Sequence, residues 1–278
     1  MNDINYSFFA PLFEDYIEKS KVVRKCGYWQ LPFIPYTFPN YKTSPKKFFY
    51  VGRDTYYWCE YDSMYDENGE AAPLTYLMNN ANYVSTENIR NDWGKSGAFW
   101  NMVGKLHLQL LTGTYHESID ELSIKDWELL KGIGYGNLFS IELPDTLKKK
   151  KYSPNGEAKE RCEYNDLNDL SAYRELQEMA KPFENLKTIF LAYGEPDIVF
   201  VFSWVDKDEF FEDLDYEWQE KWFEEGKRAV YVSKTHKTKV IWTSHPNRFH
   251  FLKTSAKDMC LYLVDTANKL LGNHIIHE

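Results

Sequence analysis

Phe48-Phe49-Tyr50-Val51-Gly52-Arg53-Asp54-Thr55-Tyr56-Tyr57-Trp58 is the stretch on which the interpretation of this sequence depends. Its first four residues form an apolar run of aromatic and β-branched side chains, which predicts a buried strand. The run stops at Gly52, where the backbone can turn sharply and approach a ligand. Asp54 follows just past the carboxyl end of the strand, the edge where open α/β sheets bind ligands. A carboxylate and aromatics at this edge indicate a general base beside a flat-ring pocket, although Asp in this position also commonly starts a turn.

Length and composition are those of a soluble globular protein. The chain has 278 residues, enough for one large α/β domain or two small ones, and 43% of them are hydrophobic and 27% charged. The formal net charge of -9 provides no general attraction to nucleic acid, so any phosphate contact needs a local basic patch. No run approaches the ~20 apolar residues of a membrane span, and residues 1–20 do not resemble a signal peptide. We therefore expect a cytoplasmic protein with no membrane partner.

The four cysteines do not have the spacing of a metal site. They lie far apart and form no C-x-x-C pair, so neither a zinc site nor an iron–sulfur cluster is indicated. Reduced thiols in the cytoplasm are the expected state, and we expect no metal and no cofactor. The four are Cys26, Cys59, Cys162 and Cys260.

Three more apolar runs have the character of core strands. The run at 198–204 is continuous, which is typical of a parallel strand buried on both faces. The other two core strands are expected at 136–141 and 239–243, and 228–232 predicts an added strand. Helices are expected around 5–20, 99–112, 119–130, 167–180, 183–192 and 255–271. The pattern predicts an α/β fold in three layers, α/β/α, with a short, mainly parallel four-stranded central sheet.

We expect a single domain over residues 1–278, with a helical and aromatic lead-in at 1–47 and insertions near 59–97, 144–166 and 206–227. Lys148 to Lys151 are the one strongly basic run and the best candidate for phosphate contact, although such runs are usually only solvated. The acidic segment 206–225 predicts one or two amphipathic helices, and it is also a possible surface for a protein partner. His107 lies among apolar neighbours and is expected to be a satisfied core residue.

The motif after the first strand resembles that of the uracil-DNA glycosylase superfamily. In that family a Gly-Gln-Asp-Pro-Tyr stretch follows the first core strand. Gly52, Asp54 and Tyr56 match it, whereas Arg53 and Thr55 depart from it.

The later strands continue the resemblance, which spans about Phe48 to Leu271. In the family an Asn closes the second core strand, and Asn137 stands there in this sequence. Residues 199–204 look like the third strand of the family. A His-Pro-Ser stretch follows the fourth strand, where this chain has His245, Pro246 and, in place of Ser, Asn247.

The resemblance implies a base-excising enzyme that hydrolyses the N-glycosidic bond to uracil or a related base in DNA. Asp54 would orient or deprotonate the attacking water, and His245 would stabilise the anionic leaving base. Asn137 would read the base edge because an amide offers a donor and an acceptor. Tyr56 would wall the pocket against a methyl group at the 5-position. The implied base-binding residues are Gly52, Arg53, Tyr56 and Asn137, and the candidates for DNA contact are Asn247, Arg248 and Phe249, with Phe251 as a further candidate for a duplex wedge.

The sequence leaves a second hypothesis open. The aromatic floor of the pocket is not assignable from spacing, and Tyr57, Trp58 and Tyr76 are all candidates. The net charge, the acidic segment 206–225 and the altered first motif are also compatible with a catalytically inactive glycosylase-like scaffold. Such a scaffold would act as a binding module for a nucleobase, a nucleotide or a protein.

Overall fold

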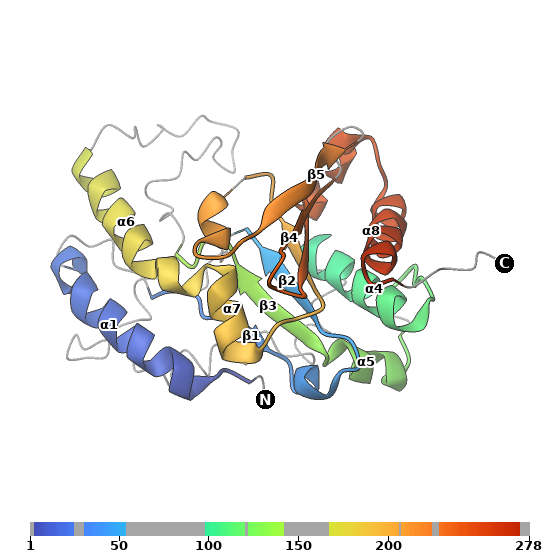
Figure 1. Cartoon of the computed structure of the whole chain (residues 1–278), viewed down its shortest axis with the longest axis horizontal. Coiled ribbons are helices and arrows are strands. Elements are labelled where there is room, and N and C mark those ends of the chain that lie inside the picture. The colour runs from blue at the N-terminus through green and yellow to red at the C-terminus, as the bar shows by residue number, and fades with distance from the viewer. Residues whose placement is uncertain are drawn as a thin grey trace, which may run out of the picture.

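One mixed sheet forms the centre of the protein. A computed structural model describes residues 3–24, 31–53, 98–119, 122–141, 167–205, 207–223 and 228–272. Within these residues seven strands pair in the order β1-β3-β2-β4-β7-β6-β5 (Figure 1). The strands are β1 Tyr36–Thr37, β2 Phe48–Gly52, β3 Ile133–Asn137, β4 Ile198–Phe202, β5 Glu217–Phe223, β6 Arg228–Val232 and β7 Lys239–Thr243.

The core of the sheet is parallel, and its edges are antiparallel. β2 pairs in parallel with β3 on one side and with β4 on the other, and β4 pairs in parallel with β7. These are the four core strands expected from the sequence. The expected four-stranded sheet is nevertheless too small, because β1, β6 and β5 extend it with antiparallel pairings.

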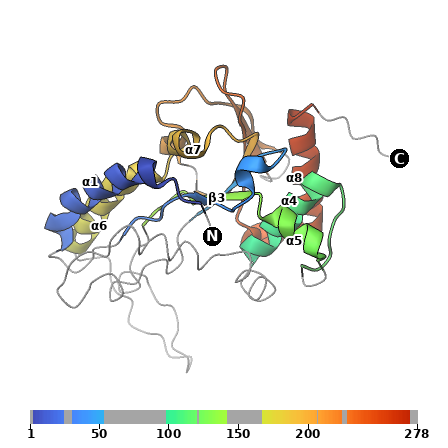
Figure 2. The same ribbon diagram turned by 90° about the horizontal axis from the view of Figure 1, so that it is seen from below.

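Helices cover both faces of the sheet. Successive residues of β2 point to opposite faces, and the ring of Phe49 lies near Tyr193 of α7 whereas Tyr50 contacts His107 of α4. Figure 2 shows α4, α5 and α8 on one side of the strands and α1, α6 and α7 on the other. None of the described helices is long and apolar enough to cross a membrane. The helices are α1 Tyr6–Arg24, α4 Ala98–Thr112, α5 Ile124–Leu130, α6 Leu167–Ala180, α7 Leu186–Tyr193 and α8 Ala256–Leu270.

The strand order creates a switch point between β2 and β4. The chain leaves β2 through α4 and α5 to reach β3 on one side, and it then passes through α6 and α7 to reach β4 on the other side. Because such crossovers are right-handed, opposite directions of travel put the two helix sets on opposite faces. In sheets with this order, ligands bind outside the carboxyl ends of the strands at the switch point.

Several expected elements differ from the structure, and the helix expected at 119–130 begins only at Ile124. β3 begins at Ile133 rather than 136 and ends at Asn137 rather than 141, so Gly134 and Gly136 both lie inside the strand. A side chain at Gly134 would collide with the ring of Phe49, so glycine there permits close packing. Within its described residues, 207–223, the acidic segment does not form the expected amphipathic helices: it contains only the short 3-10 helix η5, Asp208–Phe211, followed by the edge strand β5.

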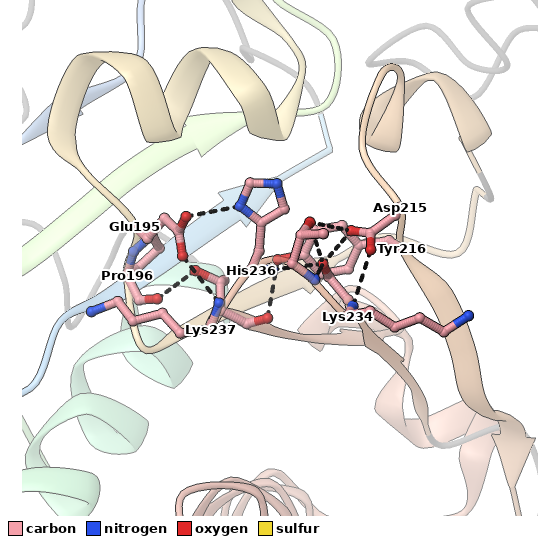
Figure 3. A network of polar contacts seen from close by, with 10 residues as sticks. Glu195, Pro196, Asp215, Tyr216, Lys234, His236 and Lys237 are labelled. Atoms are coloured by element: carbon pink, nitrogen blue, oxygen red, sulfur yellow. Dashed lines mark hydrogen bonds and ion pairs between the residues drawn. The ribbon is translucent and has the colours of Figure 1, made fainter.

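A polar network holds the amino ends of β4 and β7 together (Figure 3). Glu195 interacts with His236 Nδ1 at 2.8 Å and accepts the backbone N–H of Lys237 at 3.1 Å. Asp215 accepts from the hydroxyl of Thr235 at 2.8 Å and from the N–H of Lys234 at 3.1 Å. These contacts anchor the β6–β7 connection at the edge opposite to the one where ligands bind in α/β sheets.

His107 is a satisfied core residue, as the sequence predicts. It is fully buried on α4, with Nδ1 3.1 Å from the Tyr50 hydroxyl and Nε2 3.1 Å from the carbonyl oxygen of Leu129. A carbonyl can only accept, so the proton lies on Nε2 and Nδ1 accepts from Tyr50. Burial lowers the pKa of His107 to about 4. The hydrogen bond to the Leu129 carbonyl raises this pKa, but its effect is smaller than that of burial.

We expect His107 to make the protein acid-labile. Its pKa falls from 6.5 in the unfolded chain to about 4 in the folded one. The folded state therefore favours the neutral ring, and stability is complete above pH 6.5 and falls as the pH decreases towards 4. The loss should reach about 3 kcal/mol, at 1.36 kcal/mol per pKa unit. Urea unfolding between pH 7 and pH 4 measures it, and the His107→Gln variant should lose this part of the pH dependence; an unchanged dependence would contradict the assignment.

Candidate functional site

The carboxyl ends of the parallel strands bring together side chains that the sequence assigns to one site. They lie on the face of the sheet that α4 covers. Phe99, in the first turn of α4, lies next to Gly52 and packs against Phe202, and Tyr135 donates to Asn137 on the same face. We call this group the strand-end cluster. Its members are Gly52, Arg53, Phe99, Tyr135, Asn137, Trp204, His245 and Arg248.

Asn137 is the polar centre of the strand-end cluster. It closes β3, is only 3% exposed, and its Oδ1 accepts from the hydroxyl of Tyr135 at 2.9 Å. Its Nδ2 has no hydrogen-bond partner among the described residues. An unpaired buried donor costs about 1–3 kcal/mol, so this amide group is suited to a ligand that accepts its hydrogen bond.

Gly52 lies directly against this amide. A Cβ atom at this position would be 2.6 Å from Oδ1 of Asn137 and 3.3 Å from the hydroxyl of Tyr135. The neighbouring strands pair Gly52 with Asn137 in register, so the two residues are fixed side by side. Only glycine leaves room here for Asn137 in its observed position.

His245 follows β7 and begins the 3-10 helix η6, Pro246–Leu252. Its Nδ1 accepts the backbone N–H of Asn247 at 3.3 Å. In the neutral ring this bond puts the proton on Nε2, which makes Nε2 a donor. The imidazole is half-buried and lies nearly parallel to the ring of Phe99, with centroids 6.0 Å apart and an interplanar angle of 16°.

Phe99, Tyr135 and Trp204 belong to the strand-end cluster although the sequence analysis did not assign them to the site, and Phe99 is the clearest case. Its apolar spacing with the rest of α4 indicated only a core stripe. The ring packs edge-on against Phe202 and also neighbours Tyr135 and His245. One signal could have found it: α4 starts beside the carboxyl ends of the strands, so a large aromatic in its first turn faces that edge.

Two arginines lie over one exposed tryptophan. The guanidinium carbon of Arg53 is 4.2 Å from the ring centroid of Trp204, and that of Arg248 is 3.9 Å from it. Trp204 also meets His245 edge-on and is 38% exposed. The ends of β2, β4 and β7 therefore contribute a cation, an aromatic ring and a second cation to one surface.

A buried ion pair holds the chain segments that leave β3 and β4. Lys207 forms an ion pair with Glu184 and donates to the carbonyl oxygen of Leu138 at 2.6 Å. Glu184 also accepts from the N–H of Ser140 at 2.6 Å and from its hydroxyl at 2.9 Å. Because residues 138–140 follow Asn137 directly, this pair positions the segment that begins at the site.

Most of the sequence-predicted residues that the structure describes meet at this edge, and one does not. Asn247 and Arg248 are exposed on η6. Phe249 is only 3% exposed and belongs to the hydrophobic core, so its assignment to DNA contact is wrong. Phe251, two residues later, is 70% exposed and is the aromatic side chain that η6 presents to solvent. Asp54, Tyr56, Tyr57, Trp58, Tyr76 and the lysine run 148–151 lie outside the described residues.

Replacing Gly52 by alanine should disable the site while leaving the protein folded. The new methyl group displaces the Asn137 side chain and breaks its hydrogen bond with Tyr135. We expect ligand binding to fall at least tenfold because the amide loses its position. Gly136→Ala is the matched control, since its side chain would face Phe49 and Pro35 on the opposite face of the sheet. Equal effects of the two changes on binding, at equal stability, would contradict the role of Gly52.

The described residues contain no group of three or more His, Cys, Asp or Glu side chains that could hold a metal ion. No protein-family model matches this chain, and no curated protein matches it.

Proposed function

We propose that the protein hydrolyses the N-glycosidic bond of uracil, or of a related base, in DNA. The observation that carries the proposal is the buried, unpartnered Nδ2 of Asn137 beside Gly52, at the carboxyl edge of the sheet. This edge lies close to the switch point, where the sheet topology favours ligand binding. A cytoplasmic location, a single domain and a reaction without metal or cofactor belong to the same proposal.

The amide of Asn137 suits the edge of uracil. Nδ2 is a donor for the O4 oxygen of the base, and Oδ1, which has two lone pairs, can accept the N3–H while keeping the bond from Tyr135. Phe99 supplies an aromatic ring beside this edge. Cytosine presents an amino group where uracil presents O4, so the donor Nδ2 would disfavour it.

The reaction needs a base and a group that stabilises negative charge. Asp54 accepts a proton from water, the water oxygen bonds to C1′ of the sugar, and the bond from C1′ to N1 of the base breaks. The base leaves with the electron pair of that bond as an anion. His245, with its proton on Nε2, donates to the O2 oxygen of this anion.

A binding module remains the second candidate. Within the described part of the chain, the strand-end cluster supplies an amide, an imidazole, aromatic rings and guanidinium groups. These groups are of the kinds that bind a base and a phosphate, and binding alone needs no nucleophile and no general base. The choice between an enzyme and a binding module depends on whether Asp54 acts as a general base, and Asp54 lies outside the described residues.

Release of uracil from single-stranded and duplex oligonucleotides tests the proposal. The purified protein is incubated with DNA that contains one uracil, and abasic sites are cleaved with alkali and counted. Strand cleavage that depends on uracil supports the enzyme. Intact DNA, with folded protein that still binds uracil-containing strands, overturns the enzyme and supports the binding module.

A further inference from the structure

We infer that Tyr135 is a positioning residue that fixes which end of the Asn137 amide faces the bound base. In this way it sets the preference of the site for a base that presents an acceptor. The inference rests on the proposed function, because it concerns the amide that reads the base. It adds a residue that the resemblance to the glycosylases does not imply.

The first step is the fixed position of the Tyr135 hydroxyl. Tyr135 and Asn137 are two residues apart on β3, so their side chains leave the strand on the same face. The ring of Tyr135 packs against Trp100 with centroids 4.6 Å apart and meets Phe33 edge-on at 5.4 Å. A ring that is packed on several sides and only 9% exposed does not swing away. The hydroxyl is therefore held beside the amide.

The second step is the hydrogen bond between the two side chains. The Tyr135 hydroxyl donates to Oδ1 of Asn137 at 2.9 Å, and the bond is buried. An amide has two different ends, an oxygen that only accepts and a nitrogen that only donates. Because the oxygen is bound to Tyr135, the nitrogen is the end that has no partner among the described residues.

The third step is the contact with Gly52, which favours the same orientation. A Cβ atom on this glycine would be 2.6 Å from Oδ1, so the glycine hydrogen in its place points at that oxygen. An oxygen accepts such a C–H contact weakly, whereas a rotated amide would set its own N–H hydrogens against the glycine hydrogen. The O–H···O bond from Tyr135 is the stronger of the two preferences. Both neighbours of Oδ1 thus keep Nδ2 facing the ligand.

A donor fixed in this way selects between bases by the group that it meets. Uracil presents its O4 oxygen, which accepts from Nδ2, whereas cytosine presents an amino group, and two donors then face each other. An amide that turned freely could pair with either base by presenting its nitrogen or its oxygen. Loss of the Tyr135 hydroxyl should therefore reduce discrimination between the bases and not only affinity.

Tyr36 offers a matched control for this hydroxyl. β1 and β3 pair Tyr36 with Tyr135 in register, and the two rings meet edge-on with centroids 5.6 Å apart. The Tyr36 hydroxyl is also buried, but it has no hydrogen-bond partner among the described residues. Tyr36→Phe therefore removes an unpaired buried group and leaves the amide of Asn137 untouched.

Binding of free bases tests the inference without DNA and without catalysis. The probes are uracil and cytosine, titrated separately with the full-length protein and followed by NMR through their H5 and H6 signals. The wild-type protein should bind uracil at least about 30-fold more tightly than cytosine, because cytosine leaves buried donors unpaired. Tyr135→Phe should reduce this preference about tenfold, and Tyr36→Phe should keep it within about twofold of the wild-type value.

A purely structural role of Tyr135 gives a different result. Phenylalanine keeps the ring and its packing, so both variants retain the aromatic contacts around β1 and β3. If the hydroxyl only stabilised the fold, Tyr135→Phe would weaken both bases by the same factor. An unchanged ratio of the two affinities in this variant would overturn the inference.

The outcomes also separate this inference from the proposed function. If the preference falls in Tyr135→Phe and the folded wild-type protein releases no uracil from DNA, the positioning role stands and the enzyme does not. If uracil is released but Tyr135→Phe keeps the wild-type preference, the enzyme stands and the role of Tyr135 is wrong. Wild-type protein that binds neither base, or binds both equally, overturns the inference whatever its activity on DNA.

Discussion

Replacing Lys207 by methionine should lower the free energy of unfolding by about 3–5 kcal/mol, the usual cost of breaking a buried ion pair. The side chains of Lys207 and Glu184 are 10% and 4% exposed. Methionine fills a similar volume but leaves the Glu184 carboxylate buried without a counter-charge, and it also removes the donor to the carbonyl oxygen of Leu138. Urea unfolding followed by tryptophan fluorescence measures the loss.

A second change should recover most of this loss. In Lys207→Met/Glu184→Gln the neutral amide oxygen can still accept from Ser140, and no buried charge remains. The double variant should therefore be more stable than Lys207→Met alone, with a coupling energy of about 1–3 kcal/mol. Lys187→Met serves as the control, because its pair with Asp213 is exposed and worth less than about 1 kcal/mol. If Lys207→Met costs no more than this control, the pair does not stabilise the fold.

The ion pair also matters for the site, since it fixes the chain just after Asn137. Ser140 and Leu138 are held by Glu184 and Lys207, respectively. Neither contact was foreseen from the sequence, because the two charges are separated along the chain and each lies among other charged residues. An ion pair between residues far apart in the sequence leaves no recognisable sequence pattern, whereas a buried strand is recognisable as a continuous apolar run.

The strands of the core could be predicted because burial on both faces leaves a continuous apolar run. β2, β4 and β7 were found in this way, and the added strand β6 was expected where it occurs. β5 was not found, because it is an edge strand on which Glu217, Trp218 and Gln219 are all exposed, and because Trp218 and Trp222 fall at a helical spacing in the sequence. Apolar and polar residues do not alternate along β5, and its pairing with β6 is irregular, because the register shifts twice.

The site was predictable only in part, and for a topological reason. Parallel strands put their carboxyl ends at one edge, so Gly52, Asn137 and His245 could be assigned to the same place from sequence. The position of a side chain on a helix that covers this edge depends on where the helix starts, and Phe99 was missed for that reason. On η6 the 3-10 geometry turns Phe249 into the core and Phe251 out to solvent, and an apolar pattern alone does not distinguish the two.

Replacing His245 by alanine should lower kcat for uracil release by about 10²–10³-fold, the usual cost of losing one donor to a developing anion. The ring lies against Phe99, and its Nδ1 is engaged by the N–H of Asn247, which keeps Nε2 protonated. The loss should fall on kcat rather than KM, because the charge on the base develops only in the transition state. Single-turnover kinetics on a uracil-containing strand measures this split.

The matched control for this variant is His236→Ala. His236 precedes the same strand, β7, and is held by Glu195 at the opposite edge of the sheet (Figure 3). Its loss removes a histidine and its contact with Glu195 without touching the strand-end cluster, so kcat should stay within about twofold when both proteins are assayed fully folded. Asp54→Asn should show a loss of about 10²–10⁴-fold, as expected for a general base. If His245→Ala retains wild-type kcat while Asp54→Asn loses activity, the leaving base is stabilised by another group, and the role assigned here to His245 is wrong.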